Sequence, residues 1–209
     1  MSVNPMIIAG FDPSINETGW GIISNVAPDD SHKVGTVLAY GVISGNPWMN
    51  KSPMKNRAGF IERGTFDAIE SFTRKHLVRP CHCGIEYADD EVRKGRHWRS
   101  LRKLEAATWA IYWALIRYGF TKSEITMMEV KALKRSKRGV VKSKIMTARD
   151  MERLYAFPTR KHGEALPDHV TDAINVAHAT LADLRIGIAR RHGWDVKKQG
   201  PRRRSGATT

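Results

Sequence analysis

The chain has 209 residues, of which 41% are hydrophobic and 27% charged, ordinary values for a globular protein. Its formal net charge of +14 is not ordinary. The excess lies in two segments, since residues 131–161 carry a net +9 and residues 185–209 a net +7. Basic segments on a near-neutral body indicate a polyanionic partner, most often nucleic acid. An anionic membrane surface is the weaker alternative, because neither segment pairs its charges with a broad apolar face.

Membrane and secretory signals are missing from the sequence. No apolar run approaches the length of a membrane span, and the N-terminus lacks the charged start and apolar stretch of a signal peptide. Two cysteines, Cys81 and Cys83, are too few for a disulfide scaffold, so we expect a protein of the reducing cytoplasm. Their Cys-His-Cys spacing is not that of a zinc knuckle. A strand is expected there, with a zinc site as the alternative.

Residues 7–23, IIAGFDPSINETGWGII, stand out first along the chain. Two short apolar runs bracket a Pro-Ser turn, which predicts a hairpin at the start of a sheet. Asp12 would end the first strand, where a carboxylate is costly to bury without a cation or a donor. Gly19 and Gly21 carry no side chain and would let a backbone or a phosphate come close. A simple strand-ending turn is the plain alternative for Asp12.

Strands and helices alternate after this hairpin. We expect strands over 34–44, 81–87 and 124–130, helices over 55–76, 101–118 and 142–155, a last helix from Asp168, and loops or basic segments over 89–99, 131–138 and 157–166. This order predicts an α/β protein with helices on the faces of a five-stranded sheet. We expect one domain over 1–190 and a disordered basic tail over 191–209.

The helix expected over 101–118 is apolar nearly all round, with Trp109, Tyr112 and Trp113 on several sides. A helix of this kind is buried on two sides. It would be either a central core helix or part of a subunit interface.

Acidic residues stand at the ends of three predicted elements. Asp12 ends the first strand, Glu86 ends the fourth, and Asp172 lies early in the last helix. His169 and Asp168 precede Asp172 by three and four residues, so both flank its face of the helix. Each has a structural explanation by itself: a solvated strand end for Glu86, a helix N-cap for Asp168 and a surface position for His169.

The pattern Asp-Pro-Ser, three residues and Thr-Gly-Trp-Gly, in residues 12–21, resembles the opening motif of the RuvC-type Holliday junction resolvases. The resemblance covers about residues 6–185 and implies an RNase H-like mixed sheet flanked by helices. It also implies an acid on the first strand, a Glu on the fourth, and a pair three residues apart on the last helix. These positions fall on Asp12, Glu86, His169 and Asp172, with Asp168 as the alternative to His169.

Such a cluster would hydrolyse a phosphodiester with two divalent ions, which activate water and stabilise the leaving oxygen. The resemblance implies Mg²⁺, with Mn²⁺ as a substitute. We expect Asp12 to bridge the ions, Glu86 and Asp172 to hold one each, and His169 to ligate or to position the water.

The resemblance also assigns roles to basic residues. Lys131, in Glu-Val-Lys after the fifth strand, matches a catalytic lysine near the scissile phosphate, and Lys142, in GVVKSK, matches another. A solvated basic face is the alternative for both. The expected DNA-binding residues are Lys131, Lys134, Arg135, Lys137, Arg138, Lys142 and Lys144.

The activity implied by the resemblance is Mg²⁺-dependent cleavage of four-way DNA junctions. A homodimer would nick two opposed strands symmetrically, with residues 101–118 in its interface. One alternative is an RNase H-like nuclease acting on other branched or flap DNA, or on structured RNA. Others are a non-catalytic junction-binding protein and an actin-like or sugar-kinase ATPase, although the latter generally needs far more chain.

Overall fold

The computed structural model describes residues 5–28, 32–45, 52–87, 98–129, 144–158 and 164–191. The strands are β1 (Ile7–Asp12), β2 (Glu17–Ser24), β3 (Gly35–Ser44), β4 (His82–Tyr87), β5 (Ile125–Glu129) and β6 (Tyr155–Ala156). The helices are α1 (Met54–His76), α3 (Trp98–Tyr118), α5 (Lys144–Leu154) and α6 (Asp168–Arg191), with a 3₁₀ turn, η2 (Lys122–Glu124), before β5.

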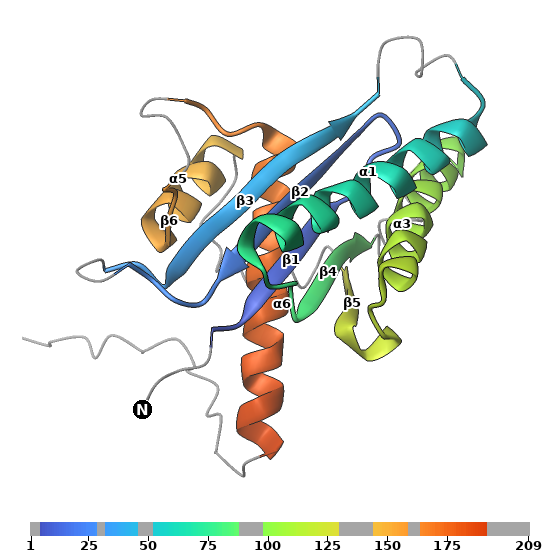
Figure 1. The fold of residues 1–209 in the computed structure, drawn as a ribbon. Helices are drawn as coiled ribbons and strands as arrows, with labels where there is room; N and C mark the ends of the chain where they lie inside the picture. The colour runs from blue at the N-terminus through green and yellow to red at the C-terminus, as the bar shows by residue number, and fades with distance from the viewer. Residues whose placement is uncertain are drawn as a thin grey trace, which may run out of the picture.

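The strands form one mixed sheet in the order β5-β4-β1-β2-β3-β6 (Figure 1). β2 is antiparallel to both β1 and β3, which makes the three-strand meander expected from the first 44 residues. β4 is parallel to β1, and β5 is parallel to β4. The carboxyl ends of β1, β4 and β5 therefore meet at one edge of the sheet.

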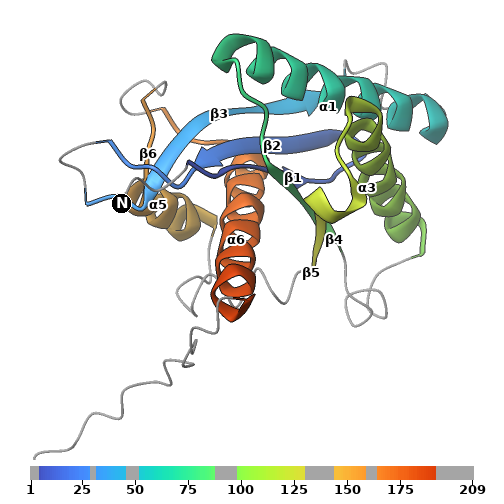
Figure 2. The same ribbon diagram turned by 60° about the horizontal axis from the view of Figure 1, so that its bottom comes forward.

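Helices cover both faces of this sheet (Figures 1 and 2). α1 and α3 pack together on one face, where Ala9 and Phe11 of β1 lie in a large apolar core. α6 lies on the other face across β1, β2 and β4, with α5 beside it, and Ile8 belongs to that second core. The split follows the alternation of side chains along a strand.

Glycines bring α6 very close to the sheet. A Cβ added at Gly10 would lie 2.2 Å from the carbonyl oxygen of Ala173, and one added at Gly84 would lie 2.1 Å from Oγ1 of Thr180. Side chains at these positions of β1 and β4 would push the helix outward. The glycines thus allow α6 to pack directly on the sheet, with its N-terminus at the carboxyl ends of β1 and β4.

The expected fold class is confirmed, and the hairpin and the helices lie within a few residues of their predicted bounds. Patterning did not predict β6, so the described part of the chain has six strands instead of five. β6 pairs only with Gly35 and Thr36 at the start of β3, and a strand of two residues has no periodicity to detect. The segments expected over 89–99, 131–138 and 191–209 fall almost entirely outside the described residues.

α3 is buried on one side within a single chain. Ile111 and Leu115 are fully buried, whereas Trp109 and Trp113 are 47% and 53% exposed. Both tryptophan rings make edge-to-face contacts with Tyr112, at centroid distances of 5.4 and 5.5 Å. The expected burial on two sides is therefore not met inside one chain, and an exposed aromatic face remains. No helix in the described ranges is long and apolar enough to cross a membrane.

Candidate catalytic site

Asp12 and His169 are in direct contact. Asp12 ends β1 and points toward α6, because Ile8 and Gly10 at the alternate positions also face that helix. Nδ1 of His169 lies 2.7 Å from Oδ2 of Asp12. The Asp12 side chain is 14% exposed and that of His169 is 34% exposed. An ionised carboxylate only accepts hydrogen bonds, so Nδ1 of His169 donates and Asp12 has the donor that its partial burial requires.

Gly19 makes this contact sterically possible. It lies opposite Asp12 in the β1–β2 register. A Cβ added there would lie 2.0 Å from the carbonyl oxygen of His169 and 2.3 Å from its carbonyl carbon. The prediction that Gly19 admits a close backbone is supported, and the backbone is that of the first turn of α6.

Thr18 holds the turn that follows Asp12. It is fully buried, and its Oγ1 donates to the Ser14 carbonyl at 2.8 Å and accepts from the Ser14 amide at 3.3 Å. No role for Thr18 followed from its place in the sequence, although a threonine hydroxyl near a turn is a known partner of local backbone groups. Thr18 therefore stabilises the turn, and Gly19 leaves the space in which the first turn of α6 packs.

Glu86 lies beside Asp12 on the neighbouring strand. In the parallel pairing of β1 with β4, Phe11 is aligned with Ile85, so Asp12 and Glu86 occupy the next positions. Gly84 faces α6, and Glu86, two residues later, faces the same way. Adjacent strands are about 4.8 Å apart, which makes the two acidic residues neighbours at the sheet edge.

Asp172 lies over the end of β4. Gly84 lies beneath Val176 and Thr180 of α6. Asp172 precedes Val176 by one helical turn, which is about 6 Å along the axis of α6. Glu86 follows Gly84 by two residues, which is about 6.6 Å along β4. The helix and the strand run in opposite directions, so these steps place Asp172 near Glu86. The structure thus gathers all four predicted site residues at one edge.

The donor set suits a divalent metal by residue type. Three carboxylates supply the hard oxygen ligands that Mg²⁺ prefers, and the imidazole of His169 adjoins Asp12. Among the residues that the structure describes, however, no group of three or more His, Cys, Asp or Glu side chains is already close enough to hold an ion. Binding would require the carboxylates to turn toward one another.

Asp168 is not the N-cap that the sequence suggested, because it is already the first residue of α6. The Thr171 amide donates to the Pro167 carbonyl at 3.0 Å, so Pro167 occupies the position expected for the cap. Asp168 is exposed in the first turn, where a carboxylate interacts favourably with the helix dipole.

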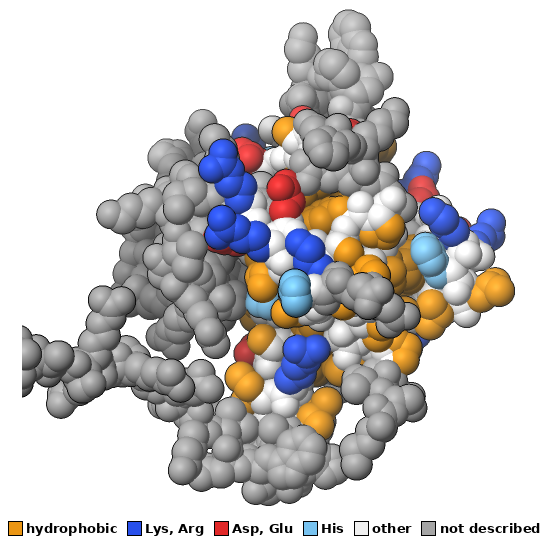
Figure 3. All heavy atoms as spheres, turned by 90° about the vertical axis from the view of Figure 1, so that its left-hand side faces the viewer, with side chains coloured by type: hydrophobic (Ala, Val, Ile, Leu, Met, Phe, Trp, Pro, Cys, Tyr) orange, Lys and Arg blue, Asp and Glu red, His pale blue; other side chains and the backbone are white. Residues whose placement is uncertain are grey.

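The predicted DNA-binding residues lie at the margin of the described structure. Lys131, Lys134, Arg135, Lys137, Arg138 and Lys142 fall outside it, and Lys144 is the first residue of α5. Figure 3 shows Lys and Arg side chains scattered among apolar ones on the face that it views, with no continuous basic surface among the described side chains.

Two residues at the opposite end of β4 have pKa values that burial shifts. Burial lowers the pKa of His82, whose Nε2 lies 2.8 Å from Oγ1 of Thr126. Burial also raises the pKa of the Cys83 thiol well above its usual range, as suits a core residue, while Cys81 is exposed. The zinc alternative gains no support, because no metal-holding group exists among the described residues.

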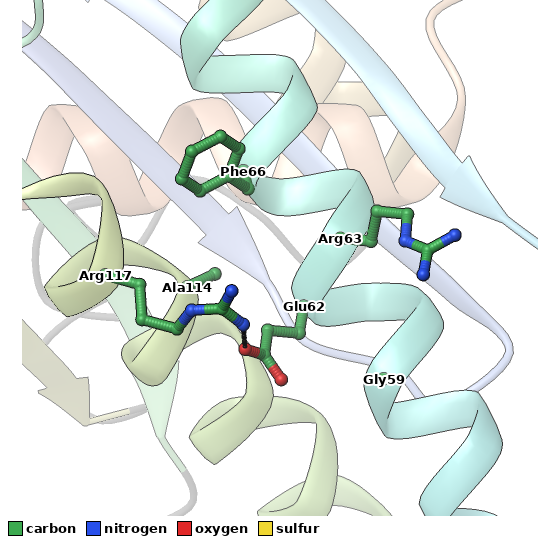
Figure 4. A pocket seen from close by; sticks show the side chains of 6 residues that line it. All are labelled: Gly59, Glu62, Arg63, Phe66, Ala114 and Arg117. Atoms are coloured by element: carbon green, nitrogen blue, oxygen red, sulfur yellow. Dashed lines mark hydrogen bonds and ion pairs between the residues drawn. The ribbon is translucent and has the colours of Figure 1, made fainter.

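A cleft of about 370 Å³ lies between α1 and α3, on the face of the sheet opposite α6 (Figure 4). Glu62 of α1 and Arg117 of α3 form an ion pair across it, and Phe66 and Ala114 also line it. None of the predicted catalytic residues contributes to this cleft.

Comparison with known proteins defines the fold. No protein-family model matches the chain, and no curated protein matches it significantly. Solved structures do match, and the class that they define is the RuvC-type, RNase H-like α/β fold.

The particular structures are resolvases. Thermus thermophilus RuvC in complex with a Holliday junction substrate aligns with a TM-score of 0.64 and 22% identity, over 87% of this chain and 96% of that chain. Thermus thermophilus RuvC in a second structure gives 0.61 and 21%, over 87% and 97%. The yeast mitochondrial Holliday junction resolvase Ydc2 gives 0.54 and 12%, over 88% and 83%. At these identities the likeness shows a shared fold, and the fold implied by the motif in residues 12–21 is confirmed.

Proposed function

We propose that this protein is a metal-dependent endodeoxyribonuclease that resolves four-way DNA junctions by paired, symmetric nicks. A fold by itself does not imply an activity, so the proposal depends on the site. The observation that carries it is the contact between Asp12 and His169, with Glu86 and Asp172 at the same edge of the sheet. This donor set, in this order on these elements, is what the motif resemblance implies for a RuvC-type nuclease.

The proposed ligands of Mg²⁺ or Mn²⁺ are Asp12, Glu86, His169 and Asp172. When bound, two such ions activate the attacking water and stabilise the leaving oxygen of the phosphodiester. Asp12 is the proposed bridging ligand, because it lies between Glu86 on β4 and His169 over β2. The hydrogen bond from Nδ1 of His169 to Asp12 holds the imidazole ring and leaves Nε2 to orient the water. For His169 to ligate an ion that Asp12 also holds, this hydrogen bond would have to give way to the metal.

DNA binding and dimerisation complete the proposal. Lys131 would contact the scissile phosphate, and the basic residues between it and Lys144 would hold the flanking backbone by charge. A four-way junction has two-fold symmetry, so two opposed nicks require two sites related by the same symmetry. The exposed aromatic face of α3, with Trp109 and Trp113, is the proposed contact between copies. If the protein is bacterial or phage-encoded, a DNA-processing role would place it in the cytoplasm of the bacterium or of the phage-infected host cell.

The test is a panel of end-labelled substrates: a four-way junction, a flap, a duplex and a single strand of the same sequence. We expect the junction to be cut at paired positions on opposed strands in Mg²⁺ or Mn²⁺ and to remain intact in EDTA. Faster cleavage of the flap, or of structured RNA added to the panel, would replace the proposed substrate. Binding of the junction without cleavage in either metal would indicate a non-catalytic junction-binding protein.

A further inference from the structure

Arg57 places a cation at the tip of the hairpin that carries Asp12. Its Nη1 donates to Oδ1 of Asn16 at 3.1 Å, which joins α1 to the β1–β2 turn. Asn16 follows Asp12 by four residues, so the backbone between them spans at most about 14 Å. The guanidinium is therefore held near the proposed site by a contact between elements far apart in sequence.

Arg57 is a partly buried arginine without a counter-ion, whereas the other described arginines without an ion pair, Arg63, Arg149, Arg153 and Arg185, are exposed. Elsewhere in the described residues, Arg74 pairs with Glu70, Arg79 with Glu124 and Arg117 with Glu62. The hydrogen-bonding partner of Arg57 is the neutral amide of Asn16. No carboxylate of the described residues pairs with the Arg57 guanidinium. Its side chain is partly buried, and Nε is shielded from water without a partner. A partly desolvated cation without an anion is costly, so a structural tie alone is a poor explanation for an arginine here.

The start of α1 adds to this positive potential. Its first turn contains no acidic residue, and Pro53 at the N-cap supplies no side-chain hydrogen bond. Residues 52–61 include Lys55 and Arg57 and no Asp or Glu. The positive end of the helix dipole adds to these charges.

We propose that Arg57 binds a phosphate of the DNA strand that passes the β1–β2 turn on its way to the site, with Asn16 holding the guanidinium in place. This inference rests on the proposed function and adds a DNA contact on the α1 side of the sheet, remote in sequence from the basic segment 131–144. Arg57 keeps Nη hydrogens that are not given to Asn16, and the planar guanidinium group can donate two of its hydrogens to phosphate oxygens.

The test measures binding of a labelled four-way junction to the full-length protein in EDTA, across a series of KCl concentrations. Arg57→Gln removes the charge but keeps a side chain that can donate to Asn16, whereas Arg57→Lys keeps the charge. Lys75→Gln is the matched control, since it removes one charge from an exposed position 18 residues along the same helix, about 27 Å away.

We expect Arg57→Gln to bind about tenfold more weakly, the usual size for the loss of one charge-assisted hydrogen bond. The slope of log affinity against log salt should become shallower by about 0.7–0.9 per protomer. Arg57→Lys should keep most of the slope, and Lys75→Gln should match the wild type. A slope for Arg57→Gln equal to that of the wild type, whether or not its melting temperature falls, would overturn the inference. Failure of the wild-type protein to bind the junction would instead reject the proposed function.

Discussion

Gly19→Ala tests whether the first turn of α6 really packs on the hairpin strand opposite Asp12. The new Cβ would lie 2.0 Å from the carbonyl oxygen of His169, whereas carbon and oxygen atoms normally approach to about 3.3 Å. The obstacle is helix backbone, and α6 is also held against Gly10 and Gly84, so relief must come from a displacement of more than about 1 Å. Overpacking of this kind costs about 1–3 kcal/mol.

For a protein of this length, that cost lowers the melting temperature by roughly 2–12 °C. The same displacement would separate His169 from Asp12, and an error of about 1 Å at a catalytic group can cost 10²-fold in rate. The assays are thermal unfolding and junction cleavage. Gly59→Ala is the control: a Cβ there meets nothing within 4 Å, so alanine should stabilise α1 by about 0.5–1 kcal/mol. A Gly19→Ala protein that melts within 1 °C of the wild type and cleaves normally would refute the reasoning.

Three further predictions concern separate parts of the chain. His169→Ala should abolish most junction cleavage and also cost about 1–3 kcal/mol of stability, because the partly buried Asp12 loses its donor. Asp168→Ala should lose the dipole contribution of about 0.3–1 kcal/mol and keep its activity. Loss of cleavage in Asp168→Ala but not in His169→Ala would exchange the two roles. Burial holds the pKa of His82 below 6.5 in the folded state, so the unfolded chain takes up the proton first and the stability of the fold falls as the pH drops below 6.5. His82→Gln should therefore reduce the fall in melting temperature between about pH 7 and pH 5.5. A dependence of melting temperature on pH equal to that of the wild type would contradict this prediction. Truncation after Gly193 should weaken junction binding and reduce its salt dependence while leaving cleavage intact, and an unaltered salt titration would show that the tail does not contact DNA.

The fold was predictable where its signals are local. The hairpin follows from two apolar runs around Pro13 and Ser14, and α1, α3 and α6 follow from apolar spacing over several turns. β6 was missed because its two residues form a strand only by pairing with the start of β3. For α3 the sequence left a core helix and a subunit interface open, because an apolar pattern does not show which sides of a helix its own chain covers.

The site was predictable in its residue types and not in its geometry. Asp12 stood out as a carboxylate at the end of an apolar strand, yet its partner His169 is 157 residues away, and no local pattern joins them. The link is Gly19, which the sequence marked as a place of close approach without naming the element that approaches. Arg57 gave no signal in the sequence, since its contact with Asn16 exists only once α1 has packed near the turn.

The central claim is that Asp12 belongs to a metal-dependent nuclease site, and cleavage of a labelled four-way junction by wild-type protein and Asp12→Asn in Mg²⁺ tests it most directly. Asparagine preserves the shape of the side chain and removes the charge that a metal ion requires. We expect paired nicks by the wild-type protein and none by Asp12→Asn, with junction binding in EDTA retained or tightened because a negative charge near phosphate is gone. A folded Asp12→Asn protein that cuts the junction at close to the wild-type rate would contradict it.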